Sequence, residues 1–152
     1  MPGPATPGSA SWPDLNHPLA SQLQLGCDAL QVPPDERQQA SLLDYLDLLS
    51  RWNRAYNLTA VRDPLDMVTR HLFDSLCVDP WVRGPRIVDV GTGAGLPGIP
   101  VALLRPGDRF TLLDSAGKRT RFLRHVVARL GIENVEVVQA RVEDYDGAAG
   151  FD

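Results

Sequence analysis

The chain has 152 residues, of which 43% are hydrophobic and 22% are charged, and its formal net charge is -4 at pH 7. This composition is typical of one soluble globular domain and excludes collagen-like, low-complexity and membrane-spanning chains. The 2 cysteines do not form a C-x-x-C pair, so the sequence predicts neither a disulfide framework nor a metal site. Residues 51–130 contain 13 basic and 7 acidic residues, whereas both flanking segments are acidic. An anionic partner is therefore expected at the middle of the chain.

The first half of the chain has the pattern of a helical region that follows an irregular start. Residues 1–18 contain 5 of the 13 prolines and are predicted to be a disordered tail. This start lacks the basic and apolar regions of a signal peptide, so a cytoplasmic protein is expected. Apolar spacing, with helix starts at Asp35 and at Asp63-Pro64, predicts three helices. They cover residues 19–30, 35–56 and 64–77.

The second half has the pattern of strands that alternate with helices. Strands are predicted at 87–90, 110–113 and 135–138, and helices at 99–104 and 118–130. This order predicts a parallel sheet with crossover helices, to which the helical region 19–80 adds an N-terminal cap. Residues 150–152 look like the approach to a fourth strand, and three strands are few for a doubly wound fold. We therefore expect later strands to be missing and the chain to be a fragment.

The stretch VDVGTGAGLPGIP, Val88 to Pro100, follows the first predicted strand and fits two kinds of ligand loop. Gly93, Gly95 and Gly98 match the dinucleotide fingerprint G-x-G-x-x-G. Gly91, Gly93 and Gly95, with Asp89 two places earlier, fit a loop that holds S-adenosylmethionine instead. Both ligands carry adenosine and would lie at the carboxyl ends of parallel strands.

Asp89 favours the methyl donor over the dinucleotide. A dinucleotide places its pyrophosphate against the glycine turn, where a carboxylate would repel it. S-adenosylmethionine brings an ammonium and a sulfonium group, which an acidic residue attracts. Pro97 and Pro100 also lack the N–H groups that a pyrophosphate would use. Asp114, at the end of the second strand, suits the ribose hydroxyls of either ligand and does not discriminate between them.

Five segments together resemble one known family. WNRAYNLTAVRDP, RHLFDSL, IVDVGTGAGLPGIP, FTLLDSAGKRTRFLRHV and ENVEVVQARVED occur in the order and spacing of the RsmG (GidB) family. Its members are bacterial 16S ribosomal RNA guanine-N7 methyltransferases, and the resemblance covers residues 42–144. It implies the α/β fold of a class I S-adenosylmethionine methyltransferase, a Rossmann-like parallel sheet, with residues 81–152 as the cofactor-binding half.

The same resemblance implies a set of cofactor residues. Gly91 and Leu96 would form the loop side of the pocket, and Val142 and Glu143 would lie along the adenine. Asp114 and the adjacent Ser115 match the ribose end, and Gly93 belongs to the glycine turn. The Ser-Arg-Ala segment, whose arginine helps hold the cofactor in the family, lies beyond the stretch that the chain contains.

The expected function is methylation of guanine N7 in 16S ribosomal RNA, with S-adenosylmethionine as the cofactor. N7 has a free lone pair and no proton, so the transfer needs positioning rather than a general base. No catalytic residue is predicted, and His71 and His125 need no catalytic role. The expected partner is 16S rRNA or the small ribosomal subunit; the protein is expected to be a monomer that uses neither a metal nor a membrane.

Two groups of side chains are candidates for the contact with RNA, and a solvated surface explains them equally well. One group lies on the last predicted helix and the other on the second helix and the loop after it: Lys118, Arg119, Arg121, Arg124, His125 and Arg129, and Arg51, Trp52, Arg54, Tyr56 and Arg62. Three alternatives to the expected function remain open. They are a methyltransferase of this fold with another substrate, a non-catalytic remnant that binds the cofactor or RNA, and a nicotinamide oxidoreductase.

Overall fold

The computed structural model describes residues 19–30, 34–147 and 150–152. The predicted disordered tail, residues 1–18, lies outside the described residues. The α-helices are α1 Ala20–Asp28, α2 Glu36–Tyr56, α3 Pro64–Met67, α4 Asp74–Leu76, α5 Gly98–Leu104 and α6 Gly117–Leu130. The strands are β1 Arg86–Val90, β2 Arg109–Asp114 and β3 Val135–Gln139. A π-helical segment, Val68–Phe73, and two 3-10 turns, Asp79–Trp81 and Val142–Asp144, complete the secondary structure of these residues.

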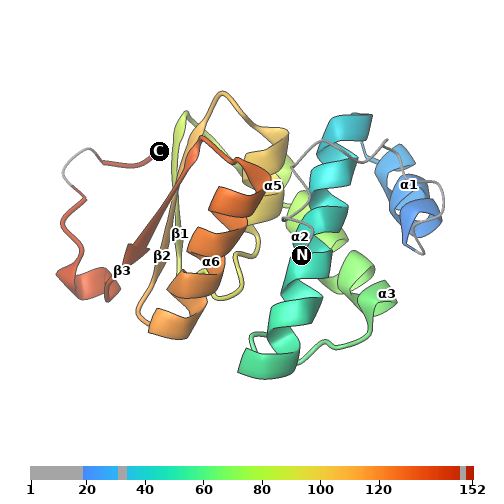
Figure 1. Ribbon diagram of the computed structural model, residues 1–152. Helices are drawn as coiled ribbons and strands as arrows, with labels where there is room; N and C mark the ends of the chain where they lie inside the picture. Colours follow the sequence, from blue (N-terminus) through green and yellow to red (C-terminus); the bar gives the residue numbers. More distant parts are fainter. Residues whose placement is uncertain (1–18, 31–33, 148–149) are drawn as a thin grey trace.

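The sheet is parallel with the order β1-β2-β3, so the predicted strand–helix alternation is confirmed. Figure 1 shows α5 and α6 on the same face of this sheet, as two right-handed crossovers in the same direction require. Helix α2 lies outside that layer, and α1 and α3 lie farther out still. The carboxyl ends of the strands point toward the lower end of the view, where α2 ends and α6 begins.

Helix α2 packs against the other N-terminal helices and also against the sheet domain, by which we mean the three strands with α5 and α6. It begins with a capping box, in which the Asp35 carboxylate accepts a 2.8 Å bond from Gln38 N and the Gln38 side chain accepts one from Asp35 N. It ends at Asn57, which takes the left-handed conformation at φ 50°. Its leucines join one continuous core with side chains of α1, α5 and α6. The helical region therefore shares its hydrophobic core with the sheet domain.

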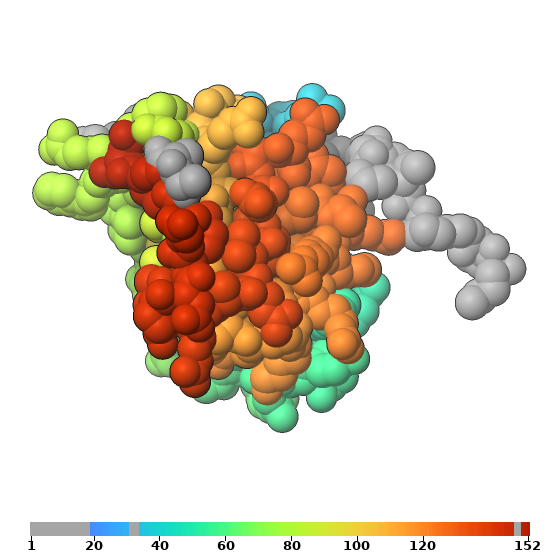
Figure 2. Space-filling view, turned by 90° about the vertical axis from the view of Figure 1, so that its left-hand side faces the viewer, coloured from blue at the N-terminus to red at the C-terminus, as the bar shows by residue number. Residues whose placement is uncertain are grey.

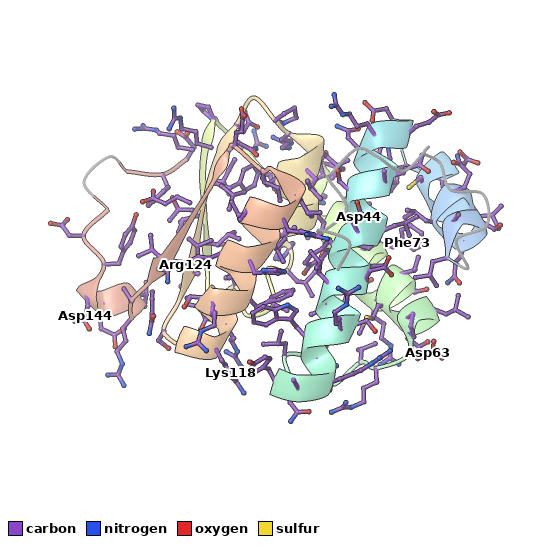
Figure 3. The ribbon with its side chains drawn as sticks, viewed as in Figure 1. Asp44, Asp63, Phe73, Lys118, Arg124 and Asp144 are labelled. Atoms are coloured by element: carbon purple, nitrogen blue, oxygen red, sulfur yellow. The ribbon has the colours of Figure 1, made fainter. Side chains whose placement is uncertain are left out.

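Helix α1 contains Gly26, which weakens the sequence pattern of a helix at that point. A Cβ atom on Gly26 would collide with the ring of Phe73. Phe73 lies between α2 and α1 in Figure 3. The glycine therefore lets α1 approach the π-helical segment closely, which outweighs its low helix propensity.

The third predicted helix, residues 64–77, is not one regular α-helix. It begins at Pro64 with Asp63 as its cap, as expected, but its middle is π-helical and it ends at Leu76. Met67 and Leu72 are five residues apart and both are fully buried. The i→i+5 geometry of a π-helix places residues at that spacing on the same face, which a regular α-helix does not. A pattern of 3.6 residues per turn, which predicts the helix, gives no sign of the extra residue in this turn.

The segment after β3 lies on the sheet face that α5 and α6 leave uncovered. In Figure 2 this segment, in red, runs across the face turned toward the viewer. Asp152 N donates a 2.8 Å hydrogen bond to Arg86 O, and the Asp152 carboxylate accepts one from Arg86 N. The chain at Asp152 thus reaches the edge of β1 that is not paired with β2. Within the described residues the sheet has three strands.

Candidate functional site

A hollow of about 440 Å³ lies at the carboxyl ends of the strands, where ligands of open parallel sheets bind. The strand ends are joined by backbone hydrogen bonds, because Gly91 N and Thr92 N both donate to Leu113 O and Ala140 N donates to Asp114 O. The hollow is lined by residues that follow each of the three strands, and by the last residues of β1 and β2. These residues are Val90, Gly91, Leu113, Asp114, Ser115, Arg119, Ala140, Arg141, Val142 and Glu143.

The structure brings five of the seven residues that the resemblance implies for the cofactor to this hollow. They come from three separate stretches of the sequence and are Gly91, Asp114, Ser115, Val142 and Glu143. Gly93 does not line the hollow itself, but its N–H donates a 2.9 Å hydrogen bond to Oδ2 of Asp114, which does. Leu96, the remaining residue of this set, packs against the main hydrophobic core and is not among the residues that line the hollow.

The glycine loop is tightly wound. Gly91, Gly93 and Gly95 have φ values of 66°, 62° and 95°, in the region that favours glycine. A Cβ on Gly95 would come within 2.6 Å of Ile99 Cγ1, so packing behind the loop requires a glycine there. A Cβ on Gly91 or Gly93 would meet nothing within 4 Å. The loop thus leaves open space at two of its glycines, next to the hollow.

Asp89 holds the glycine loop from below and does not line the hollow. Its Oδ2 accepts a 2.7 Å bond from Thr92 Oγ1 and a 3.0 Å bond from Gly98 N, the first residue of α5. Burial raises the pKa of this carboxyl, the nearby Asp114 raises it further, and the two hydrogen bonds oppose the rise. The sequence had suggested Asp89 as a partner for a cationic ligand; the structure shows it as an anchor of the loop. The sequence signal for this role was that Thr92 follows Asp89 by only three residues, which is close enough for its hydroxyl to bond the carboxylate.

The same contact argues against a dinucleotide more strongly than charge alone. In a dinucleotide fingerprint, the N–H groups at the start of the helix face the pyrophosphate. Here Gly98 N, at the third glycine of that pattern, already donates to the chain's own carboxylate. A phosphate at this position would have to displace Asp89 and would meet its negative charge.

Asp114 is a buried acid, with 4% of its surface exposed, rather than a solvated residue at the end of a strand. Oδ2 accepts from Gly93 N and Oδ1 accepts from Ala116 N, both at 2.9 Å. Arg119 Nη1 lies 3.7 Å from Oδ2 and also lines the hollow. A carboxylate has about four acceptor positions, so these two N–H bonds leave capacity for hydroxyl groups of a ligand.

Five residues of the hollow were not predicted as part of a cofactor site, and one of them is Val90, the last residue of β1. Leu113 and Ala140 belong to or follow the strands, and Arg141 precedes the residues named for the adenine end. Arg119, a candidate for the RNA contact, lines the hollow from the first turn of α6. The sequence signal for this position was that Arg119 follows the end of β2, Asp114, by only five residues, so it lies near that strand end.

The two predicted basic groups form one surface beside the hollow. Lys118 Nζ donates a 3.2 Å hydrogen bond to Tyr56 O, joining the start of α6 to the end of α2. Lys118 lies at the lower end of the molecule in Figure 3, and Arg124 lies farther along the same helix. We call this the basic surface; its exposed cations are Arg51, Arg54, Lys118, Arg119, Arg121 and Arg124. Of the other predicted arginines, Arg62 is exposed and donates to the Asn57 side chain, and Arg129 is half-buried.

The aromatic residues of this region pack mainly against one another. Trp52 is half-buried, and its ring centroid lies 5.5 Å from that of Phe122 and 5.2 Å from those of Tyr56 and His125. Trp52 thus fills the interface between α2 and α6 instead of presenting its ring face to solvent. Tyr56, with 41% of its surface exposed, remains accessible.

His71 helps to hold the loop between α2 and α3. Its Nε2 lies 2.9 Å from Thr59 Oγ1, and Thr59 N donates to the buried side chain of Asn53. Burial lowers the pKa of His71, which favours the neutral ring that shares this bond. The contacts hold the loop between α2 and α3, and neither His71 nor His125 lines the hollow.

A larger hollow, of about 630 Å³, lies near the opposite ends of the strands. It is lined by Arg86 and Arg109, the first residues of β1 and β2, and by Phe151 of the C-terminal segment. Ligands of parallel sheets bind at the carboxyl ends, so the smaller hollow is the better candidate. The described residues contain no group of three or more histidine, cysteine, aspartate or glutamate side chains placed to hold a metal ion. Among the same residues, no helix is long and apolar enough to span a bilayer.

Known proteins match this chain over a region that includes every residue lining the hollow. The family model described as "GidB: rRNA small subunit methyltransferase G" matches residues 38–152. A relative from Yersinia enterocolitica, named ribosomal RNA small subunit methyltransferase G, is 52% identical over 128 residues, which are 84% of this chain and 61% of the relative. Relatives of the same name from Alteromonas mediterranea and Stutzerimonas stutzeri are 50% and 55% identical, over 91% and 88% of this chain and 65% and 63% of their own lengths. The chain thus spans less than two thirds of the curated relatives it matches.

Proposed function

Since this chain belongs to the GidB family, rRNA small subunit methyltransferase G, we propose that its strand-end hollow holds S-adenosylmethionine as a methyl donor. The observation that carries this proposal is the open space at Gly91 and Gly93. In addition, the N–H of Gly98, at the start of α5 after this loop, already donates to the Asp89 carboxylate. This cradle admits a ligand close to the backbone but is unfavourable for a phosphate. It therefore fits a cationic adenosine ligand better than a dinucleotide.

The residues around the hollow would hold the parts of the ligand separately. Asp114 would accept the ribose hydroxyls, with its remaining acceptor capacity, and Ser115 lies beside it on the rim. Val142 and Glu143, in the 3-10 turn after β3, would lie along the adenine. Gly91 would allow the amino-acid end to pass close to the loop. We retain Leu96 only as a support of the loop, because its side chain packs into the core.

We propose N7 of a guanine in 16S ribosomal RNA as the methyl acceptor. When bound, S-adenosylmethionine supplies an electrophilic methyl group, and N7 attacks it with a free lone pair. The protein then has to align the two groups and to exclude water, and needs no general base. This agrees with a hollow in which no histidine takes part. We therefore assign no catalytic residue.

The basic surface would bind the RNA phosphates next to the methyl donor. It extends from the rim of the hollow, at Arg119, along α6 and across to the end of α2. Arginine is well suited to this role because its guanidinium binds phosphate in a bidentate manner. Tyr56, exposed beside Lys118, could stack on an unpaired base.

The first test is calorimetric titration of the purified chain with S-adenosylmethionine, with NADH as the control. We expect saturable binding of the methyl donor and none of NADH. Binding of NADH alone would contradict the proposal and would favour an oxidoreductase. A second step, transfer of a radioactive methyl group to 16S rRNA, separates an active enzyme from a cofactor-binding remnant, which would bind the donor without transferring the group.

The basic surface is tested by reversing two of its charges. An Arg121→Glu/Arg124→Glu variant is expected to bind 16S rRNA at least about tenfold more weakly, with a salt dependence reduced by roughly 1.5 in the log–log slope. Affinity for S-adenosylmethionine should stay unchanged, because neither side chain lines the hollow. The measurement is filter binding at several salt concentrations.

The matched control reverses two exposed arginines at the other end of the molecule. Arg37→Glu/Arg83→Glu changes the net charge equally, with Arg37 in the first turn of α2 and Arg83 before β1. It should reduce RNA affinity far less. Equal losses in the two variants would show that net charge, rather than the basic surface, governs RNA binding.

A further inference from the structure

A tyrosine of the N-terminal helical region contacts the glycine loop directly. Tyr45, in the middle of α2, donates a 2.7 Å hydrogen bond from its hydroxyl to the backbone carbonyl of Ala94. Ala94 lies between Gly93 and Gly95, 49 residues away along the chain. Tyr45 is completely buried, so no water can replace this bond if it is lost.

The loop needs such contacts because of its composition. Glycines lose more conformational freedom on folding than other residues, and three of the five residues from 91 to 95 are glycines. Two of the contacts come from the strands that carry the loop: Asp89 accepts from Thr92, and Asp114 accepts from Gly93. Tyr45 provides a third, from an element outside the sheet. A loop held from three sides is ordered before its ligand arrives, which reduces the entropy cost of binding.

The environment of Tyr45 keeps its hydroxyl protonated as a donor. Burial raises the pKa of this hydroxyl, and the negative charge of Asp89 raises it further. Its ring contacts Phe122 of α6, with the two ring centroids 6.4 Å apart. The side chain is thus fixed by packing against α6, and its hydroxyl meets the loop in a defined geometry.

We infer that Tyr45 is a positioning residue of the cofactor site: its bond to Ala94 O holds the turn 91–95 in the shape that admits the ligand. Helix α2 is therefore a structural part of the cofactor site as well as a cover for α5 and α6. The identity of the ligand rests on the proposed function, whereas the ordering of the loop does not.

The test compares two variants that each remove one buried hydroxyl. Tyr45→Phe keeps the ring and removes the bond to Ala94 O. Thr120→Val is the matched control, because Thr120 is fully buried on α6 and the partners of its hydroxyl, Gly117 O and Gln139 Oε1, lie outside the glycine loop. Two quantities are measured in both: native-state hydrogen exchange of the Gly95 and Leu96 amides, which donate to Thr92 O, and the dissociation constant for S-adenosylmethionine.

Tyr45→Phe is expected to speed exchange of the two loop amides about threefold to tenfold and to weaken cofactor binding by a similar factor. Thr120→Val should change neither by more than about twofold, although both variants lose some stability. Unchanged loop exchange in Tyr45→Phe would overturn the inference, and so would faster exchange with unchanged affinity. If the unsubstituted chain binds no S-adenosylmethionine, the proposed function fails, and the exchange data alone decide whether Tyr45 orders the loop.

Discussion

A Gly91→Val variant is expected to lose about a hundredfold or more in affinity for S-adenosylmethionine. Gly91 lines the hollow, and a Cβ there would meet no protein atom within 4 Å, so a valine side chain would project into the space assigned to the ligand. Overpacking of this kind costs about 1–3 kcal/mol where the surroundings can move, and more where a backbone loop must shift. Calorimetric titration of the variant measures the loss.

The control must separate this steric effect from backbone strain. Gly91 has φ 66°, a conformation that is unfavourable for valine in any environment. Gly131, at the end of α6, has φ 63° and equally open surroundings, but lies outside the hollow. Gly131→Val should therefore lose a similar free energy of unfolding and bind the cofactor normally. If Gly91→Val binds as well as Gly131→Val, the ligand does not occupy the space above Gly91.

An Asp89→Ala variant is expected to lower the free energy of unfolding by about 3 kcal/mol. The change leaves Gly98 N–H and the Thr92 hydroxyl without their shared acceptor beneath the loop, and bonds to a charged group contribute more than neutral ones. Asp89→Asn offers an amide oxygen to the same two donors and should keep most of the stability. Denaturant unfolding of both variants measures the difference, and equal losses would show that the two hydrogen bonds contribute little.

The pH dependence of these variants follows from the direction of the pKa shift. The folded protein holds the pKa of Asp89 above its unfolded value, mainly because of burial. The neutral acid is therefore the form that folding favours, and its stabilising contribution is present below the unfolded pKa and lost as pH rises through the folded pKa. Asp89→Asn removes this contribution. The stability of Asp89→Asn relative to the unsubstituted chain should therefore increase from acidic pH to pH 7, and a constant difference would contradict the raised pKa.

Local signals predicted most of the secondary structure. Asp35 and Asp63 cap helices where expected, because a side-chain oxygen bonds an N–H only two or three residues away. No strand end differs from the prediction by more than one residue. The π-helical turn at Val68–Phe73 was not predicted, because a pattern of 3.6 residues per turn gives no local signal for its extra residue.

Parts of the candidate site could also be predicted. Gly91, Asp114, Val142 and Glu143 were named from the sequence, and the fold places all four around one hollow. The sequence could indicate that they lie together, because the order of elements in a parallel α/β fold fixes which strand ends meet. The side chain of Leu96 packs against the core, and the sequence does not show which way a side chain turns within the loop.

The sequence by itself determined the order of strands and helices, the family and the stretch that forms the ligand loop, because these depend on periodicity, caps and motif spacing along the chain. Only the tertiary structure decided the role of Asp89 as an anchor, the burial of Asp114 and the contact between Tyr45 and Ala94. The last contact joins residues 49 positions apart. Such pairings arise from the packing of α2 against the sheet domain, and hydrogen bonds made across that interface have no local sequence signal.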